Sequence, residues 1–298
     1  TEWLQRLEVE YDNLRAALSW ALENRQSALA LALTSHLSWF WNLRGRVSEG
    51  RGWLEAALAL PDTGASEAHA RSLSGLAELA SNQGDWTTAW STLEAGIRMA
   101  RELGARPLLA RALATLSLFR VRGAGNAGPD SQAPADESLA LARELDDSWT
   151  LGYVLTVLDV RDVLLGHHPS DPKRGEEALA CFESVGDRWG MVLTLRHWGV
   201  GAIARGDYAA ARAAIERAYV TSQTLGDRLS QAYTLTALGD ITRVQGDYEQ
   251  ARTYYESSLM LYRDLGLKVD VPAALHNLGH VALARGDVAA AQKLQAQA

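Results

Sequence analysis

Hydrophobic residues between Arg228 and Gly266 fall into two short stripes with the three- and four-residue spacing of a helix face. The first stripe consists of Leu235, Leu238, Ile241 and Thr242, and the second of Tyr254, Tyr255, Leu259 and Tyr262. This spacing predicts two amphipathic helices. Between them, Gly246 can take the left-handed conformation that ends a helix, and Asp247 can accept hydrogen bonds from the first amides of the next one. Ala251 is small where the two helices would approach closely, so the stretch predicts a tight helix hairpin.

The same skeleton of residues returns about forty positions before and after this hairpin. Here it reads Leu238-Gly239, Gly246-Asp247-Tyr248, Ala251 and Leu265-Gly266; upstream it reads Trp198-Gly199, Gly206-Asp207-Tyr208, Ala211 and Leu225-Gly226; downstream it reads Leu278-Gly279, Gly286-Asp287 and Ala291. A sequence with such a period forms a stack of similar units, each burying its apolar face against its neighbours. We therefore predict an all-α solenoid of helix hairpins.

Turn glycines mark the successive units. They are Gly45, Gly84, Gly125, Gly166, Gly206, Gly246 and Gly286. This gives about seven units of about 40 residues over residues 27–298, the last one cut short, which we predict to form a single domain. Residues 1–26 do not follow the skeleton, and we predict that they form an N-terminal linker helix packed on the solenoid.

Two neighbouring units depart from the pattern. Gly125 is followed by NAGPDSQAPAD and Gly166 by HHPSDPKRG, and both segments hold too much proline and glycine for a helix. Helices are expected to resume near Glu137 and Glu176, so the solenoid would continue while its outer layer is shortened. These irregular loops, near 123–136 and 166–175, either reflect local divergence of the surface sequence or form a contact site.

The composition fits a soluble globular protein, with 298 residues of which 47% are hydrophobic and 22% charged. The net charge of -7 and the absence of a Lys/Arg cluster argue against a nucleic-acid surface. A single cysteine, Cys181, excludes an internal disulfide and fits a cytoplasmic location. We see neither a membrane-spanning stretch nor a signal peptide. Because the chain starts at Thr1 and stops within a helical pattern, we expect it to be a piece of a longer protein.

Several segments could suggest chemistry. Residues 123–128 match the dinucleotide pattern GxGxxG, but a helical pattern precedes them and a proline-rich loop follows, so we interpret them as a turn. No phosphate-binding GxxxxGK[ST] loop is present. His276 and His280 have the spacing of two metal ligands without an evident third, and His167-His168 with Asp171 lie in a loop. We predict neither a metal, a cofactor nor an enzymatic activity.

The ten tryptophans divide by their place in the helical pattern. On the predicted core stripes lie Trp3, Trp20, Trp86, Trp90 and Trp198. Trp39 and Trp41 are the candidates for stacking on a ligand. Cys181 lies on a short apolar stripe and is expected to be buried and inert.

The skeleton LG-x6-GDY-x2-A with a closing LG resembles the tetratricopeptide repeat (TPR), in a longer form of about 40 residues. The resemblance covers nearly the whole chain. It implies a right-handed superhelix in which the first helix of each hairpin lines a concave groove.

The opening segment WLQRLEVEYDNLRAALSW resembles a second pattern, WL-x-RLE-x-E-x-DNLRAAL-x-W. That pattern follows the ATPase and winged-helix modules of bacterial signal-transduction ATPases, the MalT-like, AfsR-like and LuxR-type transcriptional regulators. The matching residues are Trp3, Leu4, Arg6, Leu7, Glu8, Glu10, Asp12, Asn13, Leu14, Arg15, Ala16, Ala17, Leu18 and Trp20. The resemblance implies a sensor region that binds an inducer or partner and controls ATP-dependent oligomerisation of its parent protein. The family has no shared ligand motif to transfer.

We place candidate binding residues on the groove side of the first helix of each hairpin. They are Trp39, Glu78, Arg111, Tyr153, Arg196, His197, Tyr233, Asp240, Arg243, His276, Asn277 and His280. This mixed polar and aromatic set suits a protein or peptide partner, or a small-molecule inducer, and not nucleic acid or membrane. The leading hypothesis is a non-enzymatic sensor region of a larger bacterial ATPase-type transcriptional regulator. The alternative is a freestanding TPR scaffold or adaptor.

Overall fold

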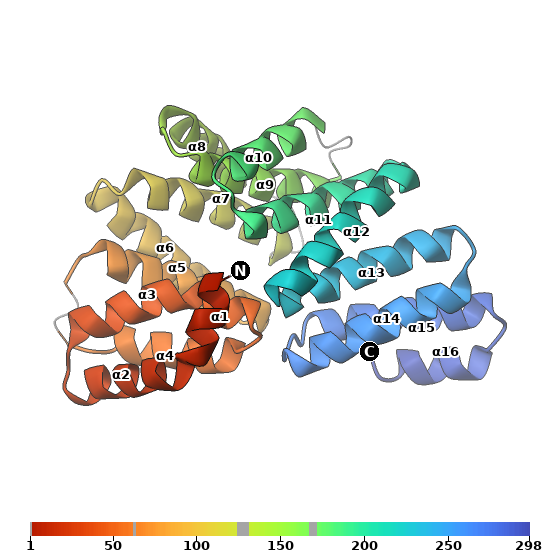
Figure 1. The fold of residues 1–298 in the computed structure, drawn as a ribbon, viewed down its shortest axis with the longest axis horizontal. Coiled ribbons are helices and arrows are strands. Elements are labelled where there is room, and N and C mark those ends of the chain that lie inside the picture. Colours follow the sequence, from red (N-terminus) through yellow and green to blue (C-terminus); the bar gives the residue numbers. More distant parts are fainter. Residues whose placement is uncertain (1, 62–63, 124–130, 167–171) are drawn as a thin grey trace.

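The computed structural model describes residues 2–61, 64–123, 131–166 and 172–298. Within these ranges the chain forms sixteen α-helices and no strand. The helices are α1 (Glu2–Val9), α2 (Tyr11–Glu23), α3 (Ser27–Leu43), α4 (Val47–Leu58), α5 (Glu67–Asn82), α6 (Trp86–Glu102), α7 (Arg106–Arg122), α8 (Gln132–Glu144), α9 (Ser148–Leu164), α10 (Pro172–Ser184), α11 (Arg188–Ala204), α12 (Tyr208–Leu225), α13 (Arg228–Val244), α14 (Tyr248–Asp264), α15 (Asp270–Ala284) and α16 (Val288–Gln295). From α3 onward they pair into seven hairpins that follow one another around a central region (Figure 1). The predicted all-α, TPR-like right-handed solenoid is confirmed.

The tight turns use the glycines that the repeat predicts. Within the described ranges, positive φ angles of 69° to 85° occur at Gly45, Gly84, Gly166, Gly206, Gly246 and Gly286. The turns between hairpins use Gly104, Gly186, Gly226 and Gly266 in the same way. A residue with a Cβ would be strained there, so glycine fixes where each helix ends. Gly125 lies outside the described residues.

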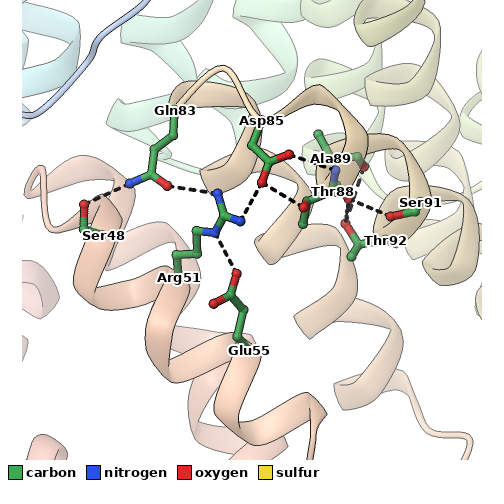
Figure 2. A network of polar contacts seen from close by, with 9 residues as sticks. All are labelled: Ser48, Arg51, Glu55, Gln83, Asp85, Thr88, Ala89, Ser91 and Thr92. Atoms are coloured by element: carbon green, nitrogen blue, oxygen red, sulfur yellow. Dashed lines mark hydrogen bonds and ion pairs between the residues drawn. The ribbon is translucent and has the colours of Figure 1, made fainter.

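Aspartates begin many of the helices. Asp85, Asp147, Asp187, Asp207, Asp227, Asp247 and Asp287 each accept a backbone hydrogen bond at a helix N-terminus. Figure 2 shows that Asp85 serves two purposes, because it caps α6 through Thr88 and accepts a hydrogen bond of 2.6 Å from Arg51 of α4. Arg51 also donates to Glu55 and Gln83. Hydrogen bonds from Thr88, and then from Arg51, lower the pKa of Asp85. The cap therefore also ties one hairpin to the next.

The core between paired helices depends on small residues opposite large ones. Ala251 is fully buried in the α13–α14 hairpin, as predicted. A Cβ at Gly239 would lie 2.5 Å from the buried ring of Tyr255. Such close approach leaves little free volume, so these helix pairs are sensitive to added atoms.

The N-terminal segment contains two helices where we predicted one, because the helix is interrupted at Glu10, between α1 and α2. Trp41 donates a hydrogen bond of 2.9 Å to the hydroxyl of Tyr11, and this pairing docks α2 on the first hairpin. Trp41 is therefore fully buried, and its prediction as a stacking residue was wrong. Trp20 was also wrongly assigned to the core, since it is 53% exposed. The role of residues 1–26 as a linker stays a prediction.

The two irregular units resume their helices earlier than predicted. α8 begins at Gln132 and α10 at Pro172, several residues before Glu137 and Glu176. Pro134 and Pro172 stand in the first turns of these helices, where a backbone N–H has no acceptor within the helix, so proline is tolerated. Both helices have 13 residues, against 17 in α6 and α14, so the outer layer is shortened as expected. The irregular segments 124–130 and 167–171, with His167, His168 and Asp171, lie outside the described residues.

The superhelix closes on itself. α3 contacts α13, and the guanidinium Nη1 of Arg44 donates a hydrogen bond of 2.7 Å to the carbonyl of Gly226, 182 positions away. The rings of Trp39 and Trp189 meet with centroids 4.4 Å apart. We call this contact between the first hairpin and α11–α13 the seam, defined by Trp39, Arg44, Trp189 and Gly226. Because of the seam, the concave side of the first six hairpins surrounds a central cavity.

Candidate ligand-binding cavity

The interior of the ring holds two adjoining compartments. The first has a volume of about 460 Å³ and the second about 400 Å³. Six residues line both of them, namely Trp39, Leu43, Glu78, Thr115, Tyr153 and Trp189. Volumes of a few hundred Å³ are typical of sites for small molecules or short peptide segments. The shared lining makes the compartments two ends of one site.

Four aromatic rings from three helices meet in the first compartment. Trp39 lies on α3, Trp149 and Tyr153 on α9, and Trp189 on α11. Trp149 and Tyr153 are stacked with centroids 5.6 Å apart, and Trp39 meets Tyr153 edge-on at 6.1 Å. We call these residues the aromatic cluster. Such rings offer large, rigid apolar surface to a ligand at little cost in conformational entropy.

A polar group lies against the aromatic cluster. The hydroxyl of Tyr153 lies 3.1 Å from that of Thr115 and donates to the carboxylate of Glu78 over 3.4 Å. The guanidinium of Arg111 stacks over Trp149 at 5.2 Å. Burial raises the pKa of Glu78 to about 7, although the hydrogen bond from Tyr153 and the charge of Arg111 oppose the rise. Glu78 can therefore change its charge near neutral pH.

The second compartment is richer in cationic residues. Arg196 donates a hydrogen bond of 2.7 Å to Nε2 of His197, and its guanidinium lies 4.6 Å from the ring centroid of Tyr233. Arg122, at the end of α7, and Asp240, on α13, complete this wall. The pKa of His197 lies well below its ordinary value, first because of burial and then because of Arg196 and Arg122. His197 is therefore neutral, and its Nε2 accepts the hydrogen bond from Arg196.

The structure brings together most of the predicted groove residues. The residues that line the cavity are Trp39, Glu78, Arg111, Tyr153, Arg196, His197, Tyr233 and Asp240. Arg243, His276, Asn277 and His280 are not part of this lining. Arg243 instead donates to the hydroxyl of Tyr255 over 3.3 Å. Whether any of these residues binds a ligand stays a prediction.

Trp149, Trp189 and Arg122 belong to the cavity wall, and sequence reasoning missed them. A signal for the two tryptophans exists. Each follows a capping aspartate by two positions, Asp147 and Asp187, at the same place in successive hairpins. Comparing these positions in register would have placed both rings on the same inner face. No comparable signal marks Arg122.

His276 and His280 lie on the exposed side of α15 with their Nε2 atoms 2.8 Å apart. Among the residues that the structure describes, no three His, Cys, Asp or Glu side chains come together as a metal site would require. Over the same part of the chain, every helix is too short or too polar to cross a bilayer. Cys181 is half-buried, and burial raises the pKa of its thiol.

Comparison with known proteins agrees with this fold. The family profile described as tetratricopeptide repeat matches residues 190–264. Proteins named as HTH-type transcriptional regulators, from Mycobacterium bovis and Mycobacterium tuberculosis, are 34% identical over 158 residues. The match covers 50% of this chain, and it spans only 18% of the length of those relatives. The chain is thus similar to a part of regulator proteins.

Two solved structures have a similar fold. A Rap protein complexed with Competence and Sporulation Factor has a TM-score of 0.72 and 11% identity, over 90% of this chain and 74% of that one. NprR in complex with its cognate peptide NprX has a TM-score of 0.54 and 17% identity, over 98% of this chain and 74% of that one. At these identities the similarity shows the fold alone, a TPR-type solenoid.

Proposed function

We propose that this chain is the sensing region of a larger transcriptional regulator and that it binds a peptide segment in the cavity. The observation that carries the proposal is the aromatic cluster, in which Trp39, Trp149 and Trp189 come from three helices and converge on one cavity. Aromatic surface inside a cavity of this size suits short ligands with apolar side chains. The relatives named as regulators support the regulatory part, and the two peptide- and factor-bound structures support the choice of ligand.

The parent protein is proposed to be an ATPase-type regulator of the signal-transduction class. The support is the opening segment, whose matching residues fall on α1 and α2, where Tyr11 joins α2 to the first hairpin. Ligand in the cavity would then change how the solenoid holds the upstream modules. Determining the coding sequence upstream of Thr1 tests this point. A phosphate-binding GK[ST] loop followed by a winged-helix segment is expected, and further TPR units in its place would favour a scaffold or adaptor.

Peptide binding is tested by selection on the immobilised chain. Random hexapeptides that are retained would be identified by mass spectrometry and titrated one by one through tryptophan fluorescence. Trp149→Ala should weaken each retained peptide at least about tenfold, because stacking on an aromatic ring contributes more than 1 kcal/mol. Trp20→Ala is the matched control, since Trp20 is 53% exposed on α2 and does not line the cavity. Equal binding by Trp149→Ala and the unmodified chain would contradict a site in the cavity.

A further inference from the structure

Two arginines of the second compartment have no carboxylate partner. Within the described part of the chain, neither Arg122 nor Arg196 has a carboxylate oxygen within 4.0 Å. Arg196 is half-buried, and the proton on its buried Nε has no hydrogen-bond acceptor. Elsewhere in the molecule arginines are paired with carboxylates, for example Arg228 with Asp264 at 2.8 Å. A buried N–H without an acceptor is costly, so an acceptor in this compartment would be strongly favoured.

The acidic residues around this compartment accept hydrogen bonds from groups other than the two arginines, although the buried Oδ2 of Asp227 has no hydrogen-bond partner. Asp227 caps α13 by accepting from the backbone of Ser230 at 2.9 Å, and Asp270 accepts from the hydroxyl of Tyr233 at 3.1 Å. Burial raises the pKa of both carboxyls. Asp240 accepts from Tyr255 at 2.7 Å. Asp227 and Asp270 act on the arginines only from a distance, so none of these acids occupies the guanidinium protons that His197 leaves open to a ligand.

Other neighbours hold Arg196 in place without neutralising it. His197 fixes one amino group of the guanidinium through the 2.7 Å hydrogen bond, and the ring of Tyr233 lies against its face. Arg122 is exposed at the end of α7 and lines the same compartment. Two guanidinium groups with free donors form a site for a planar anion, because their N–H geometry matches the two oxygens of a carboxylate.

We propose that Arg196 and Arg122 bind a carboxylate of the ligand, while the aromatic cluster binds an apolar side chain of the same molecule. The proposal rests on the proposed function and makes it more specific. The ligand is a short peptide whose carboxylate, from its C-terminus or from an Asp or Glu side chain, enters the second compartment. The shared wall of the two compartments, with Trp39, Glu78 and Tyr153, lets one ligand reach both.

The test compares three pools of N-acetylated random hexapeptides: free acids, C-terminal amides, and C-terminal amides without Asp and Glu. Retained peptides are titrated against the unmodified chain and against Arg196→Gln, Arg122→Gln and Arg228→Gln. The Arg228 variant is the control, because it removes an arginine that pairs with Asp264 away from the cavity. Melting temperatures show that each variant is folded. Since Arg122 is exposed, its variant stays informative if Arg196→Gln fails to fold.

We expect Arg196→Gln and Arg122→Gln each to weaken binding at least about tenfold, and Arg228→Gln to leave it unchanged. Loss of binding on amidation identifies the C-terminal carboxylate, and amides that bind only through Asp or Glu identify a side chain; either supports the proposal. The proposal would be overturned if peptides without any carboxylate bound equally well, or if Arg196→Gln and Arg122→Gln both left the binding affinity unchanged. The proposed function survives that outcome if Trp149→Ala still abolishes binding. If no pool is retained, both fail.

Discussion

The hairpin interiors and the seam are built in opposite ways. Inside a hairpin, contacts join residues close in the sequence, such as Tyr255 against Gly239, and the pattern recurs at the same register in neighbouring units. At the seam, Arg44 meets Gly226 across 182 positions and Trp39 meets Trp189, with no repeated pattern. In a solenoid, stability is close to a sum of the contributions of units and their neighbours. The hairpins therefore hold the fold, and the seam makes the cavity.

The largest expected effect is in a hairpin interior. Phe182 of α10 is fully buried, and a Cβ at Gly152, on α9 of the same hairpin, would come within 3.1 Å of its ring. Phe182→Ala should lower the free energy of unfolding by about 3–5 kcal/mol, because it removes buried contacts and leaves a cavity. Urea denaturation measures the loss. Val185→Ala, at a 50% exposed position near the end of the same hairpin, should stay within about 0.5 kcal/mol. Similar losses in the two variants would contradict the assigned register.

Adding atoms to a hairpin should cost less than removing a ring. Ala251 is fully buried between α13 and α14, so Ala251→Leu should overpack the pair and destabilise the chain by about 1–3 kcal/mol. Met260→Leu on the 60% exposed side of α14 is the control and should have almost no effect. An unchanged melting temperature for Ala251→Leu would show that the two helices can separate without loss.

The cavity wall should make stability depend on pH. Burial raises the pKa of Glu78 from the ordinary 4.5 to about 7 in the folded chain. The folded state then binds more protons than the unfolded state between these values, so Glu78 makes stability fall as pH rises from about 4.5 to about 7. Glu78→Gln keeps the shape and cannot ionise. The unmodified chain should lose melting temperature relative to this variant from pH 5 to pH 7.5, and parallel curves would disprove the shifted pKa.

The local features of the hairpins could be predicted from the sequence. Gly246, Asp247 and Ala251 could be assigned because each acts within a few residues and recurs in register. The closure of the ring could not be predicted from the sequence, because it results from small rotations added over several hairpins. For this reason His276 and His280 were expected in the groove, whereas they lie on the exposed side of α15 and outside the cavity lining.

The smallest effect on stability is expected at the seam, where it should be accompanied by a change in shape. Arg44 donates to Gly226 at 2.7 Å, and its Nε lies 3.2 Å from Glu8 of α1. Arg44→Gln removes this hydrogen bond and the partly exposed ion pair with Glu8, which contribute on the order of 1 kcal/mol each while the hairpins stay folded. We expect a nearly unchanged melting temperature, a larger radius of gyration in solution scattering and weaker peptide binding.

Arg101→Gln is the control for the seam variant, because Arg101 pairs with Glu137 between consecutive hairpins on the outer surface. It should change neither the radius of gyration nor peptide binding. If Arg44→Gln unfolded the chain as readily as Ala251→Leu at constant radius, the seam would belong to the stabilising core. An open but folded ring would instead show that Arg44, which also pairs with Glu8 of α1, holds the ring closed. A change at the N-terminal helix would then reach the ligand site through one arginine.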